Sequence, residues 1–214
     1  MITDTANVFT SIYRSNGFFG SESKSGPGSS LNKTEKLREE LPELLFSLSI
    51  RRLVDAPCGD MNWMSHLNYN FDCFIGVDIV EDVIIEMRNK FTSNLFYFQI
   101  GDICNDVLPK ADAIFCRDCL NHLSYQEIFK AISLFKKSES LFLFTTTFPD
   151  ALLPSDRENR DIGTGGWRIL NFQAEPFNWP TPVRLIREDR SDESAPWDKF
   201  KSLGVWTLQS LPTS

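Results

Sequence analysis

Residues 54–60, Val54-Asp55-Ala56-Pro57-Cys58-Gly59-Asp60, decide the fold class of this chain. The apolar start is typical of a buried strand, and an acid, Asp55, marks its end. Gly59 then permits a tight turn in which the backbone can come close to a ligand. In an open parallel sheet such a turn lies at the carboxyl edge, where ligands bind. The stretch therefore predicts the first strand of an α/β sheet and one wall of a ligand site.

Apolar runs and amphipathic segments alternate beyond this first strand. Strands are expected at 53–56, 73–79, 96–100, 111–116, 141–147, 183–188 and 205–209, and helices at 81–91 and 125–137. Ser124 and Glu127 form a capping box that marks the start of the second helix. Repeated strand-helix-strand units predict a mostly parallel, seven-stranded sheet with helices on both faces. The last two strands have no room for a long crossover helix between them, so we expect an antiparallel C-terminal edge strand.

Two local features before and after the first strand add detail. Leucines from Leu37 to Leu48 fall at helical spacing, but Pro42 is expected to end that helix and begin a second short one. His66 is expected on the first helix after the strand, in a structural role.

Composition excludes several classes of protein. The 214 residues, 42% of them hydrophobic, suffice for one domain with a proper core. A net charge of −7 makes nucleic acid a poor partner. No run approaches the ~18 apolar residues of a membrane helix, so we expect no membrane partner. The five cysteines are predicted to be reduced thiols, which favours a cytoplasmic location. Cys116 and Cys119 have metal-like spacing but no second pair, so no metal site is expected.

Acids at the next two strand ends indicate what the site binds. Asp78 ends the second strand about 20 residues after the first turn, where an acid takes the two hydroxyls of a ribose. Asp102 ends the third strand with the apolar Ile103 beside it, which suits an adenine base. Together these positions predict a nucleoside site.

The missing glycines indicate which nucleoside cofactor is bound. A dinucleotide site needs G-x-G-x-x-G to admit a pyrophosphate, and here only Gly59 is present. A sulfonium cofactor has no phosphates and needs acids near its positive charge, which Asp55 and Asp60 can supply. The pattern favours S-adenosylmethionine, with S-adenosylhomocysteine as product, over NAD.

These motifs resemble class I S-adenosylmethionine-dependent methyltransferases, which implies a Rossmann-like sheet. The segments 22–30, 56–64, 121–124 and 165–168 extend the resemblance over nearly the whole chain, to a bacterial subgroup associated with surface-polysaccharide and capsule modification. The resemblance and the strand-end argument together predict these cofactor contacts: Asp55, Pro57, Cys58, Gly59, Asp60, Trp63, Asp78, Ile79, Asp102, Ile103 and Arg117.

The fourth strand end is expected to face the transferred methyl group. His122 is predicted as the general base, with Asp118 orienting it or binding the acceptor. The two residues are four apart and become neighbours if their loop is helical. The alternative is that His122 only caps or packs against the following helix.

Two Gly-rich segments are predicted to close over the site. Residues 21–30 are expected to form a lid whose Ser25 and Ser29 bind the substrate, although a flexible linker is the default for such composition. In the segment 149–182, Trp167 is expected to stack on a sugar and Arg168 to hold a phosphate or carboxylate. The acidic run 188–193 is expected to be a solvated turn.

The chain is thus expected to be one domain, 1–214, divided into an N-terminal lid and helices (1–50), a cofactor core (51–148), a substrate loop (149–182) and C-terminal strands (183–214). Its predicted activity is methyl transfer to an oxygen of a small acceptor, a sugar or a sugar-linked phosphate of a surface-glycan precursor. A catalytically silent partner subunit and a nucleic-acid methyltransferase stay open as alternatives. The oligomeric state has no signature in the sequence.

Overall fold

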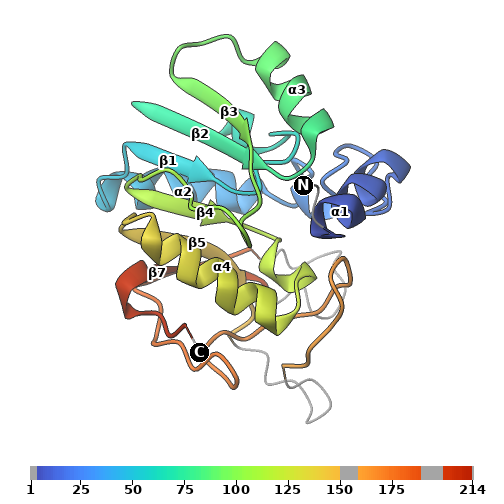
Figure 1. The fold of residues 1–214 in the computed structure, drawn as a ribbon. Helices are drawn as coiled ribbons and strands as arrows, with labels where there is room; N and C mark the ends of the chain where they lie inside the picture. Colours follow the sequence, from blue (N-terminus) through green and yellow to red (C-terminus); the bar gives the residue numbers. More distant parts are fainter. Residues whose placement is uncertain (1–3, 150–158, 189–199, 214) are drawn as a thin grey trace.

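The computed structural model describes residues 4–149, 159–188 and 200–213, which form a seven-stranded sheet with helices on both faces (Figure 1). The strand order is β3-β2-β1-β4-β5-β7-β6. The bounds are β1 Arg52–Asp55, β2 Cys73–Asp78, β3 Phe96–Ile100, β4 Ala113–Cys116, β5 Phe142–Thr147, β6 Arg184–Arg187 and β7 Ser202–Thr207.

The register brings the ends of the first strands to one edge. Asp55 pairs with Gly76 of β2 and with Phe115 of β4, and the five strands β1 to β5 run parallel. β7 pairs antiparallel with β5 and with the edge strand β6. The predicted fold class is confirmed, including the antiparallel C-terminal pair. β7 begins earlier than expected, at Ser202, because it pairs with β5 as far as Thr147.

In the described part of the chain, four α-helices surround the sheet: α1 Asp4–Ser15, α2 Glu35–Ser47, α3 Glu81–Lys90 and α4 Tyr125–Lys137. The capping box at the start of α4 is present, since the Ser124 hydroxyl accepts from the Glu127 amide and the Glu127 carboxylate accepts from the Ser124 amide. It accounts for the agreement between the predicted and observed start of this helix.

Two expectations about helices are wrong. α2 continues through Pro42, because its leucine face, Leu37, Leu41, Leu44 and Leu45, is buried as one unit. That burial outweighs the ~3 kcal/mol cost of an interior proline. His66 ends a short 3-10 turn, Met64–His66, rather than lying on an α-helix.

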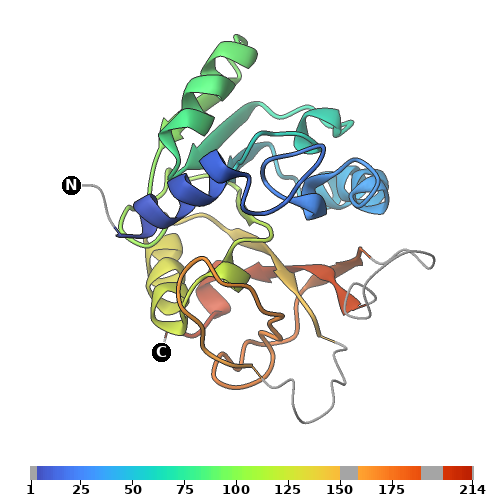
Figure 2. The same cartoon turned by 90° about the vertical axis from the view of Figure 1, so that its right-hand side faces the viewer.

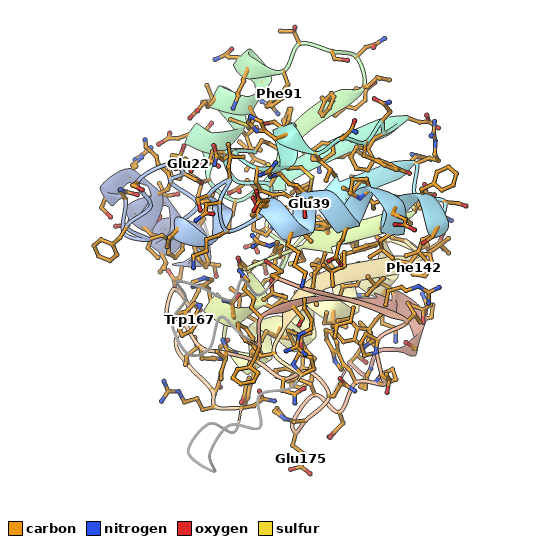
Figure 3. The ribbon with its side chains drawn as sticks, turned by 180° about the vertical axis from the view of Figure 1, so that it is seen from behind. Glu22, Glu39, Phe91, Phe142, Trp167 and Glu175 are labelled. Carbon is orange, nitrogen blue, oxygen red and sulfur yellow. The ribbon has the colours of Figure 1, made fainter. Side chains whose placement is uncertain are left out.

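The helices divide the core into two layers. α2 and α3 pack on one face of the sheet, while α4 and the aromatic side chains of residues 170–179 pack on the other. Figure 1 shows α4 in front of the sheet, and Figure 3, seen from behind, shows α2 with Glu39 across the opposite face. α1 lies across the edge at which the parallel strands end (Figure 2), and its buried Tyr13 packs with the α2 and α3 side of the core.

Candidate active site

A cavity opens at the carboxyl ends of the parallel strands. The space between its walls, open solvent included, is about 1100 Å³. Every predicted cofactor residue lines it, as do Asp118, His122, Ser25 and Ser29: the cofactor set is Asp55, Pro57, Cys58, Gly59, Asp60, Trp63, Asp78, Ile79, Asp102, Ile103 and Arg117. Residues predicted from separate sequence motifs therefore line the same cavity.

Asp55 and Asp78 form the buried acidic floor of this cavity. Burial, reinforced by Asp78, raises the pKa of Asp55 well above its usual range. Burial also raises the pKa of Asp78, to about 6, although the backbone amides of Val80 and Gly59 stabilise its charged form. These amides donate to the two carboxylate oxygens at 2.9 and 3.0 Å. The carboxylate is thus held rigidly while it faces the cavity.

Asp102 is fixed in the same way at the end of β3. Its Oδ1 accepts from the Cys104 amide at 2.8 Å, and its Oδ2 accepts from the Asn105 side chain at 2.6 Å. Ile103 lines the cavity next to it. Asp102 and Ile103, the two residues predicted to surround a base, therefore both line the cavity.

Asp60 holds the N-terminal segment 21–30 over the cavity. Its carboxylate accepts from the Ser23 hydroxyl at 2.8 and 2.9 Å, from the Lys24 amide at 3.0 Å and from the Ser25 hydroxyl at 3.3 Å. The Ser25 hydroxyl in turn accepts from the Asp60 amide at 3.2 Å. Gly59 is required here, because its φ is +53° and an added Cβ would overlap the Ser25 hydroxyl. We call residues 21–30 the lid. Asp60 both anchors the lid through these hydrogen bonds and lines the cavity.

A buried network of charges forms the wall beside Asp118. Arg117 pairs with Glu188 (Nη2–Oε2 2.5 Å) and with Asp118 (Nη1–Oδ2 3.1 Å), and it donates to the lid carbonyl of Gly28 at 3.0 Å. Lys201 Nζ lies 2.5 Å from Asp118 Oδ2 and 3.7 Å from Glu188 Oε2. Burial alone would raise the pKa of Asp118, but Arg117 and Lys201 outweigh it and hold that pKa well below its usual range.

The prediction that residues 188–193 form a solvated turn is therefore wrong for Glu188, the first residue of the run. Glu188 is 6% exposed, because its carboxylate neutralises Arg117 inside the molecule. Residues 189–193 of that run lie outside the described residues.

His122 lies in a 3-10 turn, Leu120–His122, directly before α4. Its Nδ1 lies 2.7 Å from the Gly166 carbonyl oxygen, and because a carbonyl only accepts, this contact places the proton on Nδ1. Among the described residues, no hydrogen bond involves Nε2. The Phe18 ring packs against the imidazole, with ring centroids 5.0 Å apart.

The surroundings of His122 keep it neutral. Burial lowers its pKa below the usual value, against the Gly166 hydrogen bond and the charge of Asp118, which raise it. His122 donates its orienting hydrogen bond from Nδ1 to the Gly166 carbonyl and not to Asp118, whose carboxylate accepts from Lys201 and Thr146. Asp118 acts on His122 through its charge.

The predicted substrate residues Trp167 and Arg168 do not line the cavity. Trp167 is 46% exposed on the outer surface (Figure 3). Arg168 is 2% exposed and points inward, with Nη1 donating to the Leu120 and Asn121 carbonyls at 3.4 and 3.1 Å. Their assignment to substrate binding stays a prediction.

Several residues of the site were not identified from sequence. Thr5, Phe9 and Tyr13 of α1 line the cavity, and Lys201, which is not itself a lining residue, pairs with the lining residue Asp118. The apolar spacing of α1 was the one available signal, since an amphipathic helix must cover something. Lys201 has no local motif.

Within 4–149, 159–188 and 200–213, no group of three or more His, Cys, Asp or Glu side chains is arranged to hold a metal ion. The five cysteines are free thiols. In the same ranges, no helix has the length and apolar character needed to cross a bilayer.

Comparisons with known proteins agree with the architecture. No family model matches the chain, and the search of curated proteins found no match. Among solved structures, the chain is similar to the methyltransferase domain of bacterial CtHen1, with a TM-score of 0.59 and 15% identity over 81% of this chain and 98% of that one. It is also similar to magnesium protoporphyrin IX methyltransferase (ChlM) from Synechocystis PCC 6803 with bound SAH, with a TM-score of 0.52 and 17% identity over 69% and 72%. The chain therefore has the Rossmann-like fold of S-adenosylmethionine-dependent methyltransferases.

Proposed function

We propose that this protein is an S-adenosylmethionine-dependent methyltransferase. The observation that carries the proposal is the shared cavity, in which acids at three strand ends, Asp55, Asp78 and Asp102, face the same space as His122. The donor set fits the cofactor, since Asp78 can accept from ribose hydroxyls and Asp102 with Ile103 can hold an adenine. When bound, this cofactor supplies an electrophilic methyl group on a sulfonium.

His122 is proposed as the general base. Its Nε2 carries a free lone pair, because the proton is on Nδ1, and its lowered pKa keeps the ring neutral near pH 7. Nε2 would take the proton of an acceptor hydroxyl as the oxygen is methylated. The resulting imidazolium would be stabilised by the ionised Asp118 nearby.

The acceptor is proposed to be a neutral hydroxyl. The cations beside Asp118 are already paired, Arg117 with Glu188 and Lys201 with Asp118, and a phosphoryl oxygen would meet an ionised carboxylate. A phosphoryl oxygen also needs no base. We therefore favour a sugar hydroxyl of a glycan precursor over a sugar-linked phosphate and over nucleic acid.

The test is transfer of labelled methyl from S-adenosylmethionine to a panel of nucleotide sugars and phosphorylated glycans. His122→Ala should lose about 10²–10⁴ in rate and keep its affinity for S-adenosylhomocysteine. His66→Ala is the matched control, since His66 lies outside the cavity lining, and should retain its rate. Full activity of His122→Ala would remove His122 as the base.

A further inference from the structure

The backbone of a short loop, residues 164–168, makes three hydrogen bonds to the turn that carries His122. The Gly165 amide donates to the His122 carbonyl at 2.8 Å, and the Arg168 amide donates to the Asn121 carbonyl at 3.2 Å. The His122 imidazole donates from Nδ1 to the Gly166 carbonyl at 2.7 Å. We call this segment the His122 loop, because it contacts both the backbone and the ring of His122.

The Arg168 side chain supports the same turn from inside. Besides its bonds to the Leu120 and Asn121 carbonyls, its guanidinium lies over the Tyr125 ring, 5.4 Å from the centroid. Its Nε and Nη2 are buried and have no hydrogen-bond partner among the residues that the structure describes. A buried guanidinium with unused donors is costly, so its position needs a reason. The hydrogen bonds to two carbonyls of this turn explain the buried position of Arg168. Substrate binding does not explain it, because Arg168 does not line the cavity.

The His122 loop is itself anchored on two sides. Thr164 donates to the Glu127 carboxylate at 2.6 Å, which ties the loop to the first turn of α4. Gly165 has φ of +86°, and a Cβ built there would lie 2.6 Å from Val8 Cγ1 of α1. Glycine is therefore required for the loop to fit between α1 and the His122 turn.

We propose that Gly165 and Arg168 are positioning residues for His122: the His122 loop fixes the ring as the Nδ1–H tautomer and leaves Nε2 free on the cavity side. The inference rests on the proposed function in that His122 is taken as the base. It reassigns Arg168 from binding an acceptor to holding the turn.

The proposal is tested by the tautomer of His122 in the full-length protein. Histidine labelled with ¹⁵N reports protonation of each ring nitrogen by long-range proton–nitrogen correlation at pH 8, and a His66→Gln background assigns the signals because the chain has two histidines. The wild-type ring should show a protonated Nδ1 and an unprotonated Nε2. Gly165→Ala and Arg168→Met should convert this pattern to an averaged mixture of the two neutral tautomers.

Matched controls lie next to the loop. Gly163→Ala places its Cβ in open space, and Arg160→Met removes an exposed arginine, so both should keep the wild-type pattern. Arg168→Lys retains the charge and can donate to a carbonyl, so this variant should show at least part of the wild-type tautomer pattern. Unchanged affinity for S-adenosylhomocysteine in all variants shows that the fold is kept.

Two results would overturn the inference: a wild-type His122 without a protonated Nδ1, or Gly165→Ala and Arg168→Met variants that bind S-adenosylhomocysteine and retain the wild-type tautomer. Failure of the wild-type protein to bind S-adenosylhomocysteine would instead count against the proposed function, because the tautomer is read without cofactor or acceptor.

Discussion

Arg117, which lines the cavity, and Glu188, 71 residues apart in the chain, form a buried ion pair with 2.5 Å between Nη2 and Oε2. Their side chains are only 4% and 2% exposed. The pair joins the end of β4 to the end of β6, and Arg117 extends the connection to the lid through Gly28. The lid is thus connected through Arg117 to the C-terminal strands.

Removal of one partner from this pair should be strongly destabilising. Glu188→Gln leaves Arg117 buried beside a neutral amide, and we expect a loss of about 3–5 kcal/mol in the free energy of unfolding. Urea denaturation measures it. Glu139→Gln is the control, because the Lys110–Glu139 pair is exposed and should be worth less than about 1 kcal/mol. Equal effects of the two substitutions would show that the buried pair does not stabilise the fold.

Asp60→Asn should loosen the lid. The amide can accept fewer of the hydrogen bonds from Ser23, Lys24 and Ser25, and each lost bond to a charged group costs about 1.5–3 kcal/mol. Hydrogen exchange of the peptide covering residues 21–30 should become at least about tenfold faster. Asp72→Asn, which breaks an exposed pair with Arg51, should leave this peptide unchanged. An unaltered exchange rate in Asp60→Asn would refute the anchoring role of Asp60.

Affinity for S-adenosylhomocysteine should fall as the pH drops through about 6. Burial raises the pKa of Asp78 to about 6, and the ionised form is the better acceptor for ribose hydroxyls. At pH 5 only about a tenth of Asp78 is ionised, so Kd should be roughly tenfold weaker than at pH 7.5. Calorimetry across this range measures the slope, and Asp78→Asn should flatten it. A constant Kd down to pH 5 would contradict this role.

The raised pKa of Asp78 also makes the stability of the ligand-free protein depend on pH. The pKa of Asp78 is higher in the folded than in the unfolded chain, so the stabilisation from its protonated form is complete below the unfolded pKa near 4 and is lost as the pH rises through about 6. The ionised carboxylate is thus kept at neutral pH at a cost in stability, as is common at ligand sites.

Pro42→Ala should stabilise the protein. Pro42 lies inside α2 and cannot donate the amide hydrogen bond that alanine would supply, so we expect a gain of about 1–3 kcal/mol. Thermal unfolding checks this against Pro109→Ala, a loop substitution that should be neutral or slightly destabilising. A lower Tm for Pro42→Ala would mean that the proline ring is needed for packing.

The sequence was most informative where local chemistry decides structure. Alternating strands and helices, the capping box at Ser124, and the acids at strand ends all act within a few residues, and their positions agree with the structure. The prediction that a helix ends at Pro42 was wrong because helix propensity is a local property, whereas burial of the leucine face of α2 is a tertiary effect.

The missed parts of the site depend on distant partners. Glu188 stands at the start of an acidic run typical of solvent, and only the fold brings it to Arg117. The group that orients His122 is the backbone carbonyl of Gly166, which has no side-chain signature in any sequence. Lys201 likewise becomes part of the site only through its contact with Asp118.

The most direct test of the account is calorimetric titration of the purified protein with S-adenosylhomocysteine, with NADH as the control ligand. The arrangement of Asp55, Asp78 and Asp102 around one cavity, without a glycine-rich pyrophosphate turn, predicts one site with a micromolar Kd for S-adenosylhomocysteine and no binding of NADH. Binding of NADH, or the absence of binding by S-adenosylhomocysteine, would contradict the proposed function.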